Sequence, residues 1–311
     1  MELTEADRFR PEDLDSVEAV GPITDDERFA TWHIKYDGHD AFLKYGRTEK
    51  SRGRLVNEAW GNQTMAHLAE QPQAPFRVPR LIKKDAKAGW LIAQFIDGQP
   101  LGPGDYPKEI ILAAEPLMLQ IYAFMDQAMV PPDSYGPVHF GSSHDAEAMD
   151  QKLRGKLDDI PKAAGQFEPK LIEDSLVFIK TNYGALKAAF AHGDLTPKHV
   201  MQTDEGKPYV IDFESCSLYW PRFYELINYT TKLNIVHGYT AEADDFIVKY
   251  FSAIKDSVDE HMLELKTIAA IRALLIVHEL GAKPTNRRIY NTELQLEHKD
   301  RIKATLKAAL A

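Results

Sequence analysis

The sequence predicts an α+β fold in which a small, strand-rich part precedes a larger and mainly helical part. The chain has 311 residues, of which 44% are hydrophobic and 27% charged, as in a soluble globular protein with room for two lobes. Before residue 97, segments with a two-residue alternation surround one helical segment, and beyond it helical spacing dominates. We therefore expect an N-terminal lobe of residues 1–97 and a C-terminal lobe of residues 98–311, with the boundary near 97–101.

The N-terminal part combines a hairpin, one helix and a further strand. Apolar residues alternate on both sides of Gly38, and a glycine between two alternating segments is typical of a β-hairpin. Leu55, Trp60 and Met65 share a helical face, and the prolines that follow would end that helix. The predicted elements are a short helix or strand within 1–20, a hairpin of 30–37 and 40–46, a helix over 51–69, a proline-rich loop over 71–81 and a buried strand over 89–98.

The C-terminal part has helical periodicity over most of its length. Pro116 lies inside the first helical segment, so we expect a break or a kink there. Residues 131–165 are rich in Gly, Pro, Ser and Asp, which favours a loop region or a lid. A short apolar strand is expected immediately before Asp212. The predicted helices are 108–129, 168–191, 221–233, 241–254 and 257–281.

Charge and cysteine content restrict the function classes. The net charge is −10, so the surface lacks the basic character that nucleic-acid binding requires, whereas a cationic ligand is slightly favoured. Cys216 is the one cysteine, which excludes an internal disulfide. The first residues do not resemble a signal peptide, and no apolar run reaches membrane-spanning length. We expect a cytoplasmic protein without nucleic-acid or membrane partners; the sequence does not indicate its oligomeric state.

The stretch AHGDLTPKHV, residues 191–200, concentrates side chains that carry chemistry. Asp194 opens a loop, His199 follows five positions later, and Asp212 comes after a short apolar strand. Phosphoryl transfer needs an acid that orients the attacking hydroxyl and ligands that hold a metal ion on the phosphates. Protein kinases arrange an acid, a ligand five residues later and a strand-end Asp in this order. The order and spacing therefore indicate phosphoryl transfer.

The two motifs around this stretch resemble those of a known family. HGDLTPKHV followed by VIDFES resembles the HGDxxxxN and IDFE signatures of the aminoglycoside phosphotransferase and choline kinase-like family, over about residues 20–235. The resemblance implies a bilobal protein-kinase-like fold. It also implies a kinase that transfers the γ-phosphate of ATP or GTP to a hydroxyl of a small-molecule acceptor, with Mg²⁺, or alternatively Mn²⁺, as cofactor. It does not identify the acceptor, since a shared fold does not determine the substrate.

The resemblance implies roles for residues of the N-terminal part. Lys44, in AFLKYG, corresponds to the lysine that binds the nucleotide phosphates. Glu58 follows fourteen residues later, on the predicted helix, and corresponds to the ion-pair partner of that lysine. LIAQFIDGQPL corresponds to the hinge between the lobes, where backbone groups near Gln94 and Ile96 would bind adenine.

The resemblance also implies roles in the C-terminal part. Asp194 would accept a hydrogen bond from the acceptor hydroxyl and align it with the γ-phosphorus. Asp212 would bind the metal ion, and His199 occupies the position of a second metal ligand. Lys198, inside the same loop, would either neutralise charge on the transferred group or be a solvated loop lysine, and both alternatives stay open.

One departure from the family pattern leaves a second function open. His199 stands where the family has Asn, and an imidazole suits Mn²⁺, Zn²⁺ or Fe²⁺ better than Mg²⁺. Metal binding is then altered, or one ion alone is held strongly, or catalysis is impaired. The alternative function is therefore a nucleotide-binding pseudokinase or regulatory protein. In addition, residues 15–33 contain no GxGxxG loop.

A metal hydrolase is the rival chemistry for the same stretch. Its ligand types would suit zinc or iron, and the four residues concerned are His192, Asp194, His199 and Asp212. However, no HExxH helix supports this interpretation, and it leaves Lys44 and its predicted partner unexplained. His192 is instead expected to hold the loop through hydrogen bonds of its ring. A Ser-His-Asp hydrolase is not supported, because the sequence has no GxSxG elbow.

Overall fold

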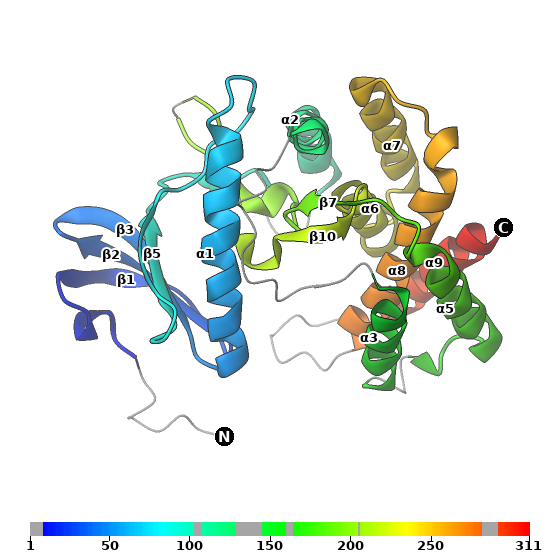
Figure 1. Ribbon diagram of the computed structural model, residues 1–311, viewed down its shortest axis with the longest axis horizontal. Coiled ribbons are helices and arrows are strands. Elements are labelled where there is room, and N and C mark those ends of the chain that lie inside the picture. The colour runs from blue at the N-terminus through cyan, green and yellow to red at the C-terminus, as the bar shows by residue number, and fades with distance from the viewer. Residues whose placement is uncertain (1–8, 103–106, 129–144, 160–163, 205, 282–291) are drawn as a thin grey trace. The chain divides into compact units, whose positions relative to one another are not determined.

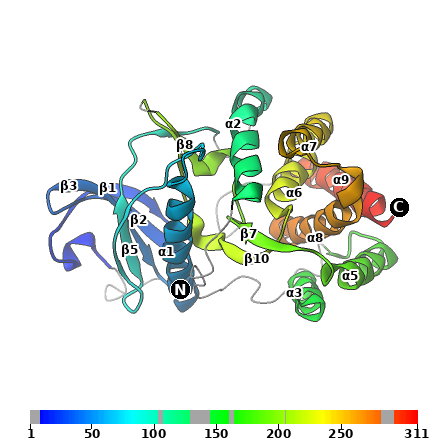
Figure 2. The same ribbon diagram turned by 45° about the horizontal axis from the view of Figure 1, so that its top comes forward.

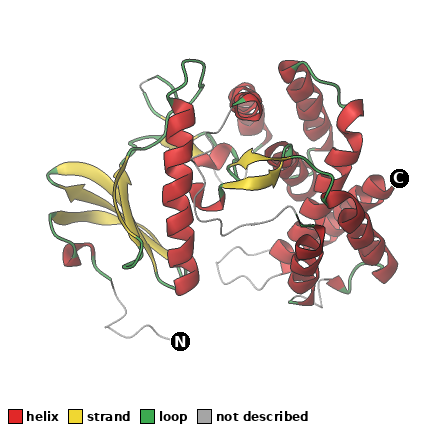
Figure 3. Cartoon of the chain, in the orientation of Figure 1, coloured by secondary structure: helices red, strands yellow, loops and turns green. Residues whose placement is uncertain are grey.

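The structure is a computed structural model that describes residues 9–102, 107–128, 145–159, 164–204, 206–281 and 292–311. An antiparallel sheet dominates the N-terminal part and helices dominate the C-terminal part, so the predicted α+β fold class is confirmed (Figure 3). The chain divides into two compact units. The first unit contains the described residues of 1–103 and 197–216, and the second unit contains those of 104–128, 141–196 and 217–311. The lobe boundary at residues 97 and 98 stays a prediction.

The first unit is built on a five-stranded sheet. Its strands are β1 (Val17–Asp25), β2 (Phe29–Tyr36), β3 (His39–Gly46), β4 (Leu81–Asp85) and β5 (Trp90–Gln94). All neighbours are antiparallel, in the order β1-β2-β3-β5-β4. The predicted hairpin is formed by β2 and β3. At its turn Asp37 and Gly38 have φ values of 49° and 78°, the positive values that a two-residue type I′ turn requires.

The sequence did not predict β4, which lies at one edge of the sheet. Its residues LIKKD lack a clear apolar alternation, because the edge strand has few side chains to bury. Lys83 and Lys84 are exposed on it, and charged residues on an edge strand oppose pairing with another chain. The prolines that precede β4 therefore favoured a loop more strongly than the residues of β4 favoured a strand.

The helix α1 (Glu49–Ala69) covers one face of this sheet (Figure 1). It confirms the predicted helix over 51–69. Thr48 caps it, because its side-chain oxygen accepts a hydrogen bond from the backbone N–H of Ser51 at 3.1 Å. Between the helix and the sheet, Leu55 packs with Leu91 and other apolar side chains. A second apolar cluster, which includes Ile34, Leu43 and Ile92, fills the opposite face of the sheet.

The alternation of β3 determines where Lys44 lies. Successive side chains of a strand point to opposite faces of its sheet. Leu43 is completely buried in the cluster on the far face. Lys44 consequently points to the face that α1 covers, where it pairs across the strands with Leu91 of β5. A lysine is therefore held in a buried position between the sheet and the helix.

The segment 197–216 also belongs to the first unit. It forms part of a three-stranded sheet of β6 (Gln99–Pro100), β8 (Val200–Gln202) and β9 (Tyr209–Val210), with single turns of helix at 197–199 and 213–215. The strand expected before Asp212 is present as the two-residue β9. β9 ends at Val210, and two residues later Asp212 adopts a left-handed backbone conformation, with φ of 67°.

Helices dominate the second unit. They are α2 (Lys108–Gln127), α3 (Ala146–Asp158), α5 (Pro169–Tyr183), α6 (Tyr224–Thr231), α7 (Thr240–Ile254), α8 (Met262–Gly281) and α9 (Thr292–Leu310). α8 and α9 pack side by side in both views (Figure 2). α2 runs through Pro116 as one helix, so the expected break is wrong. α6 leads directly into a π-helical turn, Lys232–Val236, which together match the helix predicted over 221–233.

Two predictions for the second unit are wrong in part. α3 lies inside the segment 131–165, where a loop was expected; residues 131–144 and 160–163 of that segment lie outside the described residues. The helix expected over 168–191 ends at Tyr183, and β7 (Ala188–Ala191) follows it. β7 pairs with β10 (Ser217–Pro221), a long-range contact that overrides the helix propensity of its alanines.

The sequence analysis also missed β10 and α9. β10 follows Cys216 directly and includes Pro221, where the predicted helix over 221–233 was expected to begin.

Across the described ranges, none of the helices combines the length and the apolar character that a membrane span requires.

Candidate active site

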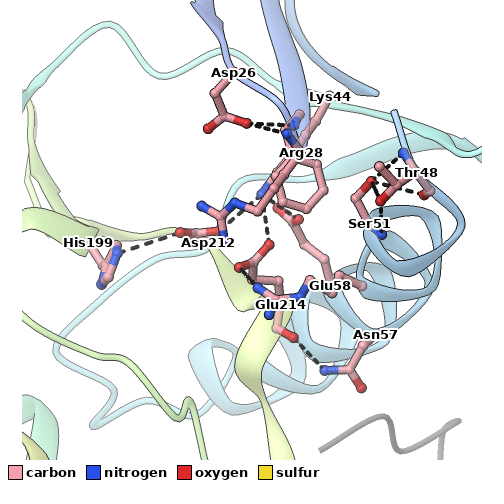
Figure 4. A network of polar contacts seen from close by, with 12 residues as sticks. Asp26, Arg28, Lys44, Thr48, Ser51, Asn57, Glu58, His199, Asp212 and Glu214 are labelled. Atoms are coloured by element: carbon pink, nitrogen blue, oxygen red, sulfur yellow. Dashed lines mark hydrogen bonds and ion pairs between the residues drawn. The ribbon is translucent and has the colours of Figure 1, made fainter. Parts of the chain in front are cut away.

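The centre of the candidate site is an ion pair between a strand and a helix of the first unit. Lys44 Nζ on β3 lies 2.7 Å from Glu58 Oε2 on α1, and both side chains are 9% exposed (Figure 4). The same ammonium lies 4.6 Å from the centre of the Phe29 ring, within cation–π distance. The structure thus brings together the two residues that the sequence paired.

Two further carboxylates of the segment 197–216 reach the same ammonium. Lys44 Nζ lies 3.0 Å from Asp212 Oδ1 and 3.8 Å from Glu214 Oε2 (Figure 4). The left-handed backbone of Asp212 is uncommon for a residue other than glycine and is frequent where a side chain is held for function. Its carboxylate is 36% exposed, whereas those of Glu58 and Glu214 are 9% and 14% exposed. Asp212 is therefore the carboxylate most open to a ligand.

The charges of this cluster shift one another's pKa values. Burial lowers the pKa of Lys44, but Asp212, Glu58 and Glu214 together raise it well above its ordinary value. Burial raises the pKa of Glu58. The attraction of Lys44 lowers this pKa, and the negative charges of Asp212 and Glu214 raise it further. Lys44 consequently remains protonated at neutral pH, and the carboxylates together still repel one another.

The helix α1 fixes the position of the loop that carries Asp212. Arg54 Nη1 donates to Glu214 Oε1 at 2.8 Å. Asn57 Nδ2 donates to the backbone carbonyls of Glu214 at 2.9 Å and Cys216 at 3.0 Å. Gly61 permits this close approach, because a Cβ there would lie 2.7 Å from the Cys216 Cβ and 2.8 Å from the Phe213 carbonyl oxygen.

Three of these carboxylates fit a divalent cation. One oxygen each of Glu58, Asp212 and Glu214 lie within 4.8 Å of one another. Glu214 Oε2 is buried and accepts no hydrogen bond within the described part of the chain. Carboxylate oxygens are the ligands that Mg²⁺ and Mn²⁺ prefer. The residues present therefore suit a metal of this class.

The histidine that departs from the family pattern lies beside this group. His199 is 5% exposed, and its Nε2 atom lies 3.5 Å from Asp212 Oδ2 (Figure 4). Among the described residues, the group of three carboxylates that could share a metal ion does not include His199. Lys198, the preceding residue, is half-buried in the helical turn 197–199. The roles predicted for both residues stay predictions.

A cavity of about 740 Å³ opens beside the cluster, and all its walls belong to the first unit. This volume lies in the usual range for a small-molecule site. Lys44, His199 and Asp212 line it together with many apolar side chains. The apolar lining includes Phe42, Leu91, Ala93, Met201 and Ile211.

The predicted hinge residues Gln94 and Ile96 also line this cavity. The backbone N–H of Gln94 donates to the Arg80 carbonyl at 2.9 Å, so the sheet already uses this donor. Ile96, two residues beyond β5, makes no backbone hydrogen bond to any described residue. Of the two predicted contacts, Ile96 therefore offers the more accessible backbone N–H.

Arg28 is a cavity residue that the sequence analysis missed. It lies in the turn between β1 and β2, is exposed, and extends toward Asp212 (Figure 4). This turn lies within residues 15–33, which contain no GxGxxG loop. The positive charge of Arg28 within this segment was the sequence signal that could have identified it as a candidate site residue.

In the second unit the loop that carries Asp194 is held by buried partners. Gly193 has φ of 85°, which favours glycine. The carboxylate of Glu225 on α6 accepts hydrogen bonds from the backbone N–H groups of Gly193 and Leu195, the latter at 3.1 Å. Tyr122 Oη donates to the Leu195 carbonyl at 2.6 Å. His192 is fully buried, and its predicted ring hydrogen bonds stay a prediction.

Asp194 itself has a cationic partner. Lys232 Nζ, at the start of the π-helical turn, lies 2.5 Å from Asp194 Oδ1. The sequence analysis missed Lys232 and Glu225, because both are more than thirty residues beyond Asp194 and no motif links them. Burial raises the pKa of Glu225 to about 7, and the hydrogen bonds from Gly193 and Leu195 oppose that rise.

The chain was compared with known proteins by sequence and by structure. The sequence model of the phosphotransferase enzyme family matches residues 19–253. No curated protein matches the chain in sequence.

Three similar solved structures illustrate the fold. A thermostable mutant of aminoglycoside phosphotransferase APH(4)-Ia, in complex with ADP and hygromycin B, is 11% identical over 96% of each chain, with a TM-score of 0.64. An ethanolamine kinase from Plasmodium vivax is 12% identical over 95% of this chain and 85% of its own, with a TM-score of 0.58. Aminoglycoside 2'-phosphotransferase-IIIa, in complex with GDP, is 14% identical over 94% of each chain, with a TM-score of 0.57. At these identities the likeness shows a shared protein-kinase-like fold.

Proposed function

This chain belongs to the phosphotransferase enzyme family, and from that premise we propose that it is a kinase for a small molecule. In this proposal it transfers the γ-phosphate of ATP or GTP to a hydroxyl group. One observation carries the proposal: Lys44 is buried between Glu58 and Asp212 and lines a nucleotide-sized cavity. Since nucleoside triphosphates are abundant in the cytoplasm, we propose the cytoplasm as its location.

The cavity lining supports this proposal. The base would lie near the predicted hinge, where the Ile96 N–H and the carbonyl of Gln94 are the proposed hydrogen-bonding groups. Lys44 would contact the α- and β-phosphates, with its position fixed by Glu58. Arg28 would approach the phosphates from the β1–β2 turn, because it lines the cavity and its charge is positive.

A divalent cation would be held where Asp212, Glu214 and His199 line the cavity. We propose Asp212 as its main ligand, with His199 or Glu214 as a second ligand from the same part of the chain. When bound, Mg²⁺ or Mn²⁺ neutralises charge on the phosphate oxygens. The imidazole of His199 favours Mn²⁺ more than the Asn of the family pattern would.

Asp194 is the proposed general base of the transfer step. It would accept a hydrogen bond from the acceptor hydroxyl and orient its oxygen toward the γ-phosphorus. A bond forms between that oxygen and the phosphorus, while the bond from the phosphorus to the β–γ bridging oxygen breaks. The hydroxyl proton passes to Asp194 and then to solvent, and the nucleoside diphosphate leaves. Lys198 is proposed to neutralise charge on the transferred group.

A nucleotide-binding pseudokinase is the second candidate function. The observation that favours it is the buried imidazole of His199, 3.5 Å from the Asp212 carboxylate, at a position where the family has Asn. This function predicts nucleotide binding without phosphate transfer. Substitution His199→Asn would then restore transfer if the imidazole is the cause of the inactivity, and persistent inactivity would exclude that cause.

The direct test compares the wild type with Asp194→Asn. Phosphate transfer from radiolabelled ATP and GTP is measured over a panel of hydroxylated small molecules, and nucleotide affinity is measured by calorimetry. We expect the variant to lose transfer by about 10²-fold or more, because the loss of a positioned acid has this magnitude, while its nucleotide affinity stays unchanged. Asp158→Asn, on the exposed end of α3, is the matched control. Unchanged transfer in Asp194→Asn would refute the proposal.

A further inference from the structure

The loop that carries Asp194 is held by one helix of its own unit, α6, and by the turn that continues this helix. The Glu225 carboxylate accepts hydrogen bonds from the backbone N–H groups of Gly193 and Leu195, the residues on either side of Asp194. Seven residues later, at the start of the π-helical turn, Lys232 Nζ donates to Asp194 Oδ1 at 2.5 Å. The same helical segment therefore holds both the backbone of the loop and the side chain that the proposed reaction uses.

The polar side chains on this face of α6 are costly, because the helix is buried. All of its residues, 224–231, are buried. Glu225, Asn228 and Lys232 are three and four residues apart, so they lie on one face. Asn228 is 1% exposed, and neither polar atom of its side chain has a hydrogen-bond partner among the described residues. Since buried polar groups without partners destabilise a fold, packing alone does not account for this face.

The contact between Lys232 and Asp194 leaves the carboxylate open to a ligand. The Lys232 side chain is 21% exposed, and a largely buried ammonium requires a close anion. The Asp194 side chain is 35% exposed. A carboxylate has two oxygens and about four lone pairs, so a contact at Oδ1 is compatible with a further hydrogen bond from a hydroxyl. The π-helical turn that begins at Lys232 belongs to a rare class that is frequent at functional sites.

An ammonium at this distance does two things for a carboxylate that acts as a general base. Its charge favours the ionised form, which is the form that can accept a proton. Its charge-assisted hydrogen bond also restricts the rotation of the carboxylate. Because phosphoryl transfer depends mainly on positioning, the fixed orientation outweighs the lower basicity. Glu225 supplies neither effect, because it is an acid and its hydrogen bonds are to the backbone of the loop.

We propose that Lys232 is a positioning residue of the phosphate transfer, which keeps the Asp194 carboxylate ionised and oriented toward the acceptor hydroxyl. This inference rests on the proposed kinase function and adds a residue outside the sequence motifs to it. The hydroxyl proton still passes to Asp194, and Lys232 neither gains nor loses a proton. The role differs from the one proposed for Lys198, which concerns the charge of the transferred group.

The first measurement uses water as the acceptor. Hydrolysis of ATP by the full chain is followed by phosphate release in the wild type, in Lys232→Met and in Lys232→Arg. We expect Lys232→Met to lower kcat about ten- to hundredfold, as the loss of one charged hydrogen bond would, with the KM for ATP unchanged. Lys232→Arg keeps a cation at this position, so its rate should be closer to that of the wild type than to that of Lys232→Met.

The pH profile separates a positioning role from a merely structural one. Removing the ammonium should move the acidic limb of the profile to higher pH by about one pH unit, because ionised Asp194 loses its adjacent cation. The charges of Glu225 and of Arg272 on α8 also act on Asp194, and both residues stay in place in these variants. A second probe needs no turnover. In protein labelled with carbon-13 aspartate, the carboxyl resonance that disappears in Asp194→Asn should titrate at a correspondingly higher pH in Lys232→Met.

Lys170→Met is the matched control. Lys170 on α5 contacts Asp174 at 2.9 Å, but its side chain is 84% exposed, so this variant removes a lysine–aspartate pair on the surface of the same unit. It should change neither the rate nor the pH profile. The inference is overturned if Lys232→Met hydrolyses ATP as the wild type does, if its pH profile and resonance are unchanged, or if Lys232→Arg is as slow as Lys232→Met.

The same samples separate this inference from the proposed function. A wild type that neither hydrolyses ATP nor phosphorylates a member of the hydroxyl panel would overturn the kinase function, while the Asp194 resonance would still show whether Lys232 holds this carboxylate. Transfer at the wild-type rate by Lys232→Met would overturn the positioning role alone. Nucleotide affinity, measured by calorimetry, should be equal in all variants, because the cavity proposed for the nucleotide belongs to the first unit.

Discussion

At the scale of single residues, the candidate site depends on one ammonium among three carboxylates. Lys44 contacts Glu58 and Asp212 closely and lies within 4 Å of Glu214. Removing a carboxylate would leave two others, but removing the ammonium leaves buried acids without their shared partner. Lys44 is therefore the residue of this cluster whose loss should have the largest effect.

We expect Lys44→Met to reduce phosphate transfer by about 10²-fold or more, because a charged contact to the phosphates is lost. Nucleotide affinity in the presence of metal should fall by about tenfold. Calorimetric titration with ATP and a transfer assay check both values. Lys84→Met, at an exposed position of β4 in the same sheet, is the control. Equal nucleotide affinity in both variants would show that Lys44 does not contact the phosphates.

Glu225 gives a pH prediction at the same scale. Burial raises its pKa from an ordinary 4.5 to about 7. The folded state thus favours the protonated acid, so its contribution to stability is complete below pH 4.5 and is lost as the pH rises through about 7. We expect the free energy of unfolding of the wild type, relative to Glu225→Gln, to fall by about 3 kcal/mol at most across this window.

Denaturant unfolding at a series of pH values measures this difference. Glu260→Gln, at an exposed position, should leave the pH profile of the wild type unchanged. Parallel profiles for the wild type and Glu225→Gln would show that the buried carboxyl does not titrate in this window.

At the scale of elements, α1 organises the candidate site. It supplies Glu58 to the lysine, and Arg54 and Asn57 to the loop that carries Asp212. These contacts need the helix to lie close to that loop, and Gly61 is the residue at the closest approach. The helix therefore joins a strand and a loop that are 168 residues apart in the chain.

Gly61→Ala tests this close approach. The added Cβ would lie 2.7 Å from the Cys216 Cβ, so the helix or the loop must shift. We expect a loss of about 1–3 kcal/mol in the free energy of unfolding, the usual cost of overpacking. Gly155→Ala on α3 is a matched control, because no atom lies within 4 Å of its added Cβ and alanine favours a helix. Equal stability of Gly61→Ala and the wild type would refute the close contact.

The elements also show what the sequence can predict. The hairpin around Gly38 was predictable, because its alternation is local. The helix α1 was predictable from the spacing of Leu55, Trp60 and Met65, which are all buried. The sequence predicts a helix where β7 forms. The strand depends on pairing with β10, a long-range contact that local sequence patterns do not indicate. Motif order located Lys44 and Asp212, whereas Glu225 and Lys232 meet the Asp194 loop only through the fold.

At the scale of the whole molecule, the two units carry different parts of the proposed reaction. The cavity proposed for the nucleotide is lined by the first unit alone, including residues of the segment 197–216. Asp194, which is proposed to orient the acceptor hydroxyl, and its partner Lys232 belong to the second unit. Nucleotide binding and acceptor binding should therefore respond to different sets of substitutions.

The central claim is that the first unit binds a nucleotide together with a metal ion. Its most direct test is the melting temperature of the full chain with ATP or GTP and Mg²⁺, Mn²⁺ or EDTA, for the wild type and for Asp212→Asn. A ligand at about 100 times its Kd adds about 2.7 kcal/mol, which should raise the melting temperature by several degrees. We predict this increase for the wild type with metal, and its loss with EDTA or in Asp212→Asn. No increase with either nucleotide, or an equal increase in EDTA and in the variant, would contradict the claim.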